Sequence, residues 1–122
     1  MGNTGFRVYV SVDRLPLDLI DQFKGIPTPN IGDCMGRFYA MSPAVKSYNK
    51  PGVNLVGSAI TVKAAPGDNL LIHKAVDIAI PGDVIVIATG GDLSHSMLGE
   101  ILCLIAQKNG VRGFVLDGVI RD

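Results

Sequence analysis

The chain has 122 residues, a length that predicts one domain, residues 1–122. Its 11 basic and 11 acidic residues cancel and form no basic stripe, which argues against a nucleic-acid partner or a charge-driven membrane role. No apolar run approaches the ~20 residues of a membrane span. The composition is nonetheless apolar for so small a domain, with 48% hydrophobic residues and a mean hydropathy of +0.35. We therefore expect a partner subunit to cover part of the surface.

The first half of the chain predicts two short helices and a long loop. Apolar residues recur at helical spacing from Leu17, and Gly25 ends that run. Thr28 is the expected N-cap of a second helix that extends to about Arg37. Residues 42–56 are rich in proline, glycine and asparagine, which is typical of a surface loop.

The second half predicts alternating strands and helices. In chain order we expect a strand at 59–64, a helix capped by Asp68 that runs to about Ile78, a buried strand at 84–88, a flexible glycine loop at 90–96, a helix at 99–108 and a strand at 114–116. The last strand–helix–strand series forms a βαβ unit over residues 84–117, whose two strands should be parallel. The fold class is therefore α/β.

Cys34 and Cys103 are the two cysteines of the chain. They lie far apart in apolar or mixed surroundings and do not form a disulfide framework. We interpret them as free, buried thiols of a protein in the reducing cytoplasm.

The spacing between Glu100 and the Arg121–Asp122 pair predicts that they meet. A helix of ~10 residues rises ~15 Å, and a strand of ~5 residues returns ~17 Å. The two lengths nearly cancel, so both ends of the segment should lie at the edge that carries the carboxyl ends of the strands. Ligands of α/β proteins bind at this edge.

The residues at this edge suit a small carboxylic acid. The N–H groups of Ile101 and Leu102 should lack intrahelical partners and face an anion. Gly99 allows a ligand close to the backbone. Arg121 presents a planar guanidinium to a carboxylate or an enolate oxygen.

The two carboxylates at the edge suit a divalent metal. Asp122 and Glu100 offer hard oxygen ligands, which favour Mg²⁺ or Mn²⁺ over softer metals. The spacing alone leaves an alternative open. Arg121 and Asp122 could form a solvated turn, and Glu100 could simply be an acidic residue favoured by the helix dipole.

Several segments resemble one known family. They are Gly99-Glu100-Ile101, residues 110–122, residues 81–86 and residues 28–36, and 21 residues separate Gly99 from Arg121. Together they resemble the family named for the regulator of ribonuclease activity A, which includes the 4-hydroxy-4-methyl-2-oxoglutarate / 4-carboxy-4-hydroxy-2-oxoadipate aldolases. The resemblance covers roughly residues 20–122.

The resemblance implies a swivelling β/β/α fold, homotrimers or homohexamers, and a site at a subunit interface. It implies a metal-dependent class II aldolase that cleaves 4-hydroxy-2-oxo acids to pyruvate, with oxaloacetate decarboxylase activity. By position, Asp122 would bind Mg²⁺ or Mn²⁺ directly and Glu100 would act on it through water. Arg121, Gly99 and the N–H groups of Ile101 and Leu102 would hold the pyruvate moiety, with Arg121 and Glu100 as the catalytic pair. Family members continue past the Arg-Asp motif, so the chain is expected to lack their C-terminal part.

The family's namesake supplies an alternative function. It inhibits ribonuclease E by contact, which needs no turnover. A protein-binding regulator of this kind has no need of an intact Glu100, Arg121 and Asp122 set, whereas an aldolase does.

Overall fold

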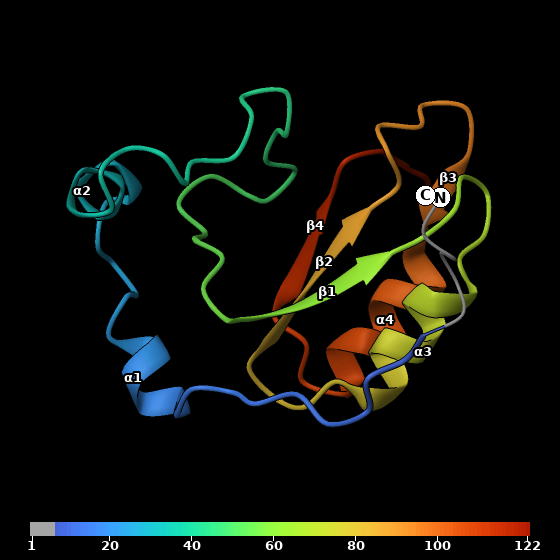
Figure 1. The fold of residues 1–122 in the computed structure, drawn as a ribbon, viewed down its shortest axis with the longest axis horizontal. Coiled ribbons are helices and arrows are strands. Elements are labelled where there is room, and N and C mark those ends of the chain that lie inside the picture. Colours follow the sequence, from blue (N-terminus) through green and yellow to red (C-terminus); the bar gives the residue numbers. More distant parts are fainter. Residues whose placement is uncertain (1–6) are drawn as a thin grey trace.

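A computed structural model describes residues 7–122, and its centre is a three-stranded parallel sheet. The strands are β1 (Ser58–Lys63), β2 (Asp83–Ala88) and β4 (Gly113–Leu116), in the order β1-β2-β4. Two helices, α3 (Leu70–Ile78) and α4 (Glu100–Lys108), lie side by side against one face of the sheet (Figure 1). The predicted α/β class and the parallel βαβ unit are thus confirmed.

The core lies between the sheet and the two helices. In β1 the buried Ile60 and Val62 alternate with exposed residues, as expected for a strand covered on one face. They lie in register with Ile85 and Ile87 of β2, both of which are fully buried. The helices complete this core with Ile72, Ala75, Val76, Leu102 and Ala106.

Helix α4 ends at a glycine. Gly110 lies one residue past the C-cap with a φ of +82°, a left-handed conformation that glycine adopts without strain. A Cβ at this position would lie 2.8 Å from Cα of Pro81, so the close approach of the two turns also requires glycine.

A second, two-stranded parallel sheet was not predicted. It consists of β3 (Ser96–Leu98) and β5 (Val119–Ile120). Residues 90–96 were predicted to form a flexible glycine loop, but the last of them, Ser96, is the first residue of β3. Figure 1 shows the C-terminus of the chain beside β3.

The helices of the first half are shorter than predicted. They are α1 (Leu17–Asp21) and α2 (Thr28–Cys34), which lie apart from the sheet (Figure 1). Pro27 is the N-cap of α2, so the prediction that Thr28 caps it was wrong by one residue. The helix stops before Gly36 and Arg37, which both have positive φ and cannot continue it.

Both cysteines are free, as predicted, but neither is fully buried. Cys34 is exposed because α2 buries none of its residues, and Cys103 is partly buried on α4. Burial raises the pKa of the Cys103 thiol. No helix within residues 7–122 is both long and apolar enough to cross a membrane.

Candidate active site

The candidate site lies where β3, β5 and the start of α4 come together. Its backbone is fixed by the small sheet, in which Leu98 pairs with Ile120, and by the N–H of Arg121, which donates to the Leu98 carbonyl at 3.0 Å. These contacts bring the last two residues of the chain back to the residue that opens α4.

Gly99 lies in direct contact with the Arg121–Asp122 pair. A Cβ built on Gly99 would lie 3.3 Å from Nε of Arg121 and 3.3 Å from Oδ2 of Asp122. The space that glycine leaves is therefore bounded by one guanidinium and one carboxylate. The two side chains are 70% and 54% exposed, with Nη1 and Oδ2 separated by 3.7 Å.

The N-terminus of α4 opens onto this contact without a side-chain cap. Its first helical hydrogen bond runs from the N–H of Cys103 to the carbonyl of Gly99, at 3.1 Å. The N–H groups of Ile101 and Leu102 precede that bond and have no partner inside the helix. The Leu102 side chain is buried and anchors the start of the helix in the core, whereas that of Ile101 is exposed. The backbone N–H groups of both residues lie at the open N-terminus of the helix.

Glu100 is exposed, and it borders a neighbouring hollow of the surface. This hollow of about 290 Å³ lies along α4, and its other lining residues include Leu104, Gln107 and Phe114. Within residues 7–122, no hydrogen bond or ion pair joins Glu100 to Arg121 or Asp122. No group of three or more His, Cys, Asp or Glu side chains in that range is arranged to hold a metal ion.

Asp117 holds the same edge of the sheet together. It directly follows β4, and its carboxylate accepts hydrogen bonds from the N–H and hydroxyl of Thr89 and from the N–H groups of Gly90 and Gly91, the last two at 3.2 Å. Burial raises the pKa of Asp117, but these hydrogen bonds outweigh burial and leave the pKa below its ordinary value. Asp117 is not among the residues that the sequence predicted for the site. One sequence signal could have revealed the contact. Asp117 directly follows one parallel strand, and Gly90-Gly91 follow the neighbouring strand, so the two segments lie at the same edge of the sheet.

The loop before β3 carries a second acidic anchor. Asp92 accepts a hydrogen bond from Nδ1 of His95 at 2.8 Å, and it also accepts hydrogen bonds from the backbone N–H groups of Ser94 and His95. The hydrogen bond from the His95 ring is the main cause that lowers the pKa of Asp92, followed by that from Ser94. These bonds shape the loop that leads into the site.

Comparison with known proteins assigns the family. The model of the RraA-like family, described as Aldolase/RraA, matches residues 28–122. The chain belongs to the RraA-like family. A protein of Halalkalibacterium halodurans that is provisionally named a 4-hydroxy-4-methyl-2-oxoglutarate aldolase is 42% identical to it over 111 residues.

Two solved structures share the fold. The RNA-processing inhibitor RraA from Thermus thermophilus superposes with a TM-score of 0.67 and 28% identity, over 79% of this chain and 57% of that one. A Pseudomonas syringae protein gives 0.74 and 28%, over 94% and 54%. The alignment with the H. halodurans relative covers 91% of this chain and 52% of the relative. The predicted fold class is confirmed, and the chain spans about half the length of these RraA-like relatives.

Proposed function

We propose that the chain carries the substrate site of an aldolase that cleaves 4-hydroxy-2-oxo acids to pyruvate and also decarboxylates oxaloacetate. The observation that carries this proposal is the contact of Gly99 with Arg121 and Asp122 at the uncapped N-terminus of α4. Membership of the RraA-like family and the names of the aldolase relatives support the same reaction class.

The open end of α4 would hold the carboxylate of the pyruvate moiety. The N–H groups of Ile101 and Leu102 carry the positive end of the helix dipole, which favours an anion at this position. Gly99 has no side chain to obstruct it. Arg121, which borders the same space, would bind the 2-oxo oxygen with its planar guanidinium.

Bond cleavage places negative charge on that oxygen. When the C3–C4 bond breaks, its electron pair forms the enolate of pyruvate, C4 becomes a carbonyl carbon, and the C4 hydroxyl loses its proton. Arg121 would stabilise the enolate, because a fixed cation aimed at developing charge lowers the barrier. Glu100, exposed in the first turn of α4, would receive the hydroxyl proton through water.

The donor set of this chain fits Mg²⁺ or Mn²⁺. Mg²⁺ is commonly held by one or two carboxylates, with water and substrate completing its octahedron. Asp122 would bind the ion directly, and Glu100 would act on it through water. When bound, the ion would supply Lewis-acid stabilisation of the enolate.

Pyruvate release from 4-hydroxy-4-methyl-2-oxoglutarate, by the purified protein before and after chelation, tests the proposal. We expect release that stops on metal removal and returns when Mg²⁺ or Mn²⁺ is added. Arg121→Lys and Asp122→Asn should each lower kcat/KM at least roughly tenfold, whereas Arg37→Lys in the exposed turn after α2 should not. Full activity after complete chelation would exclude the metal-dependent reaction.

We also propose that the protein assembles as a homotrimer or homohexamer in the cytoplasm. Three apolar residues of α4, Ile101, Leu104 and Ile105, are exposed at positions that share one helix face. Exposed apolar patches mark protein interfaces. In the proposed oligomer, a second copy of the chain would cover this face.

A non-catalytic regulator of ribonuclease E is the second candidate function. The superposition on the RNA-processing inhibitor RraA favours it. A pull-down with purified ribonuclease E distinguishes the two candidates. Binding that survives Arg121→Lys, together with absence of pyruvate release in the wild-type protein, would favour the regulator.

A further inference from the structure

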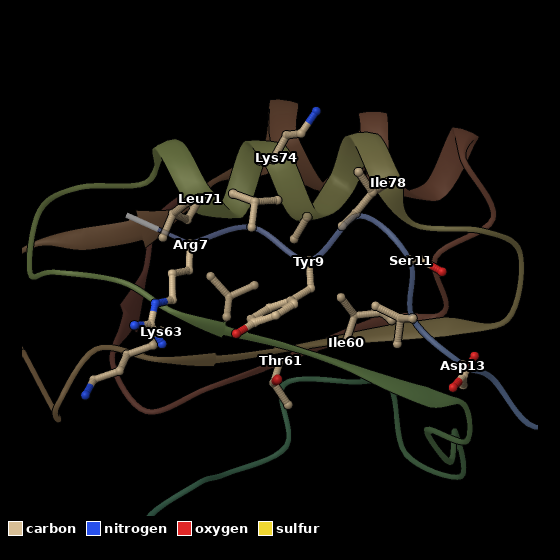
Figure 2. Close-up of a pocket in the computed structure, with 14 residues that line it drawn as sticks. Arg7, Tyr9, Ser11, Asp13, Ile60, Thr61, Lys63, Leu71, Lys74 and Ile78 are labelled. Carbon is tan, nitrogen blue, oxygen red and sulfur yellow. The ribbon is translucent and has the colours of Figure 1, made fainter. Parts of the chain in front are cut away.

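A groove of about 730 Å³ lies away from the candidate active site, between the N-terminal segment, β1 and α3 (Figure 2). Residues 7–13 form one wall, β1 forms the floor and α3 the other wall. No residue of the candidate active site lines it. Its volume falls within the range of natural small-molecule sites, about 300–1,000 Å³.

The charge of the groove is positive. Among residues 7–122, its lining includes Arg7, Lys63 and Lys74 but only one acid, Asp13. Figure 2 shows Arg7 and Lys63 at one end and Asp13 at the opposite end, while Lys74 points away from the groove. Within residues 7–122, neither Arg7 nor Lys63 makes a side-chain hydrogen bond or an ion pair. Two cations therefore meet at one end without a carboxylate between them.

An aromatic ring lies next to these cations. The Tyr9 ring crosses the middle of the groove with its hydroxyl directed toward the end that holds Arg7 and Lys63 (Figure 2). Tyr9 is 73% exposed, so a face of the ring is available for stacking. Apolar side chains from β1 and α3 continue this surface, among them Ile60, Leu71 and Ile78.

We propose that this groove binds a small organic anion with a flat apolar body. The carboxylate or phosphate head would lie between Arg7 and Lys63, because charge-assisted hydrogen bonds from a guanidinium and an ammonium are the strong contacts available there. The Tyr9 hydroxyl would donate to the same head. The apolar body would stack on the Tyr9 ring and cover the apolar wall.

NMR titration of the ¹⁵N-labelled protein with phenyl phosphate and with benzoate tests this proposal. We expect at least one of the two to shift the amide signals of residues 7–13 and of β1. The stronger of the two identifies the head group. Phenol, which lacks the charge, and inorganic phosphate, which lacks the ring, should bind at least roughly tenfold more weakly, because each forfeits one class of contact.

Three variants locate the site. Arg7→Gln combined with Lys63→Gln should weaken binding at least roughly tenfold by removing both charged donors, and Tyr9→Leu should do so by removing the ring and hydroxyl. Lys46→Gln combined with Lys50→Gln removes the same charge from the loop before β1, outside the groove, and should leave binding unchanged. The mutated side chains are exposed, and circular dichroism verifies that each variant is folded.

Two outcomes would overturn the proposal. In the first, phenyl phosphate and benzoate bind equally well to the wild-type protein, to the Arg7→Gln, Lys63→Gln variant and to Tyr9→Leu. In the second, the amide signals that shift on titration belong to residues away from the groove. The groove shares no lining residue with the candidate active site, so failure here leaves the pyruvate assay unaffected.

Discussion

Gly99 is the residue on which the proposed substrate site depends most directly. Its Cα faces both Arg121 and Asp122, and its φ of −140° is one that any residue can adopt. Alanine at this position would therefore act through its Cβ, by displacing the guanidinium and the carboxylate by a few tenths of an ångström. We expect Gly99→Ala to lower kcat/KM for pyruvate release by about tenfold, because small misplacements of catalytic groups are costly.

Gly32→Ala is the matched control for this change. A Cβ on Gly32, in the exposed α2, meets no atom within 4 Å. The control should retain wild-type activity, and thermal unfolding should show both variants close to the wild-type midpoint. Wild-type kcat/KM in Gly99→Ala would remove Gly99 and its two neighbours from the proposed substrate site.

Asp117 is expected to control stability rather than chemistry. Its carboxylate accepts four hydrogen bonds from the segment after β2, and an asparagine can accept with only one of its two polar atoms. We expect Asp117→Asn to lower the free energy of unfolding by about 1–3 kcal/mol at pH 7, as for other groups that leave donors unsatisfied. Urea denaturation measures this loss.

The lowered pKa of Asp117 fixes the pH dependence of that loss. A carboxyl group with a lower pKa in the folded state stabilises the fold fully above its unfolded pKa of about 3.9, and this contribution is lost as the pH falls through the folded pKa. The difference between wild type and Asp117→Asn should therefore narrow below about pH 4. Asp68→Asn serves as control, because Asp68 accepts a single hydrogen bond, from the N–H of Leu70. A difference that is constant from pH 7 to pH 3 would contradict the assigned cause.

At the scale of elements, one buried ion pair ties the N-terminal segment to the sheet. Asp83, the first residue of β2, is 1% exposed and accepts hydrogen bonds from Nε and Nη2 of Arg14, at 2.9 and 2.8 Å, as well as from the N–H of Ile80. These hydrogen bonds raise the pKa of Arg14 and keep it charged. The pair thus joins a segment with no regular structure to the most buried strand.

Arg14→Met should leave the Asp83 carboxylate buried without its counter-ion. We expect a loss of about 3 kcal/mol in the free energy of unfolding, measured by urea denaturation at pH 7. Arg37→Met breaks the exposed pair with Asp33 on α2 and should cost less than about 1 kcal/mol. Equal effects of the two changes would mean that the Arg14 pair contributes no more than a surface contact.

The elements that the sequence predicted best are those whose own residues determine them. Strand β2 contains a continuous run of β-branched residues, Val84 to Ile87, and α4 has apolar periodicity with a glycine past its end. Strands β3 and β5 have three and two residues, too few to show any periodicity, and they exist through their pairing with one another. The contact between Arg14 and Asp83 spans 69 positions, and no local pattern reports it.

At the scale of the whole molecule, the predicted site differs from the observed one because local sequence does not determine contacts between distant residues. Helix and strand lengths predicted that Glu100 would meet Arg121 and Asp122, but the residue that lies against this pair is Gly99, one position earlier. They could not predict the direction of Glu100, because successive residues of a helix differ by about 100° around its axis. Glu100 lines the neighbouring hollow along α4.

The exposed apolar face of α4 makes the assembly of the molecule testable. Leu104 and Ile105 are 56% and 44% exposed, although both are apolar and lie on a helix that packs its other face into the core. Burial of this face against another copy would explain why so small a domain is so apolar. We expect Leu104→Lys combined with Ile105→Lys to convert the oligomer to monomers, since a charge in an apolar interface is costly unless paired. Sedimentation velocity measures the change in mass.

Leu70→Lys, at the exposed start of α3, introduces the same side chain away from α4 and should leave the mass unchanged. A wild-type protein that sediments as a monomer, or a double variant that keeps the wild-type mass, would show that the α4 face is not the interface.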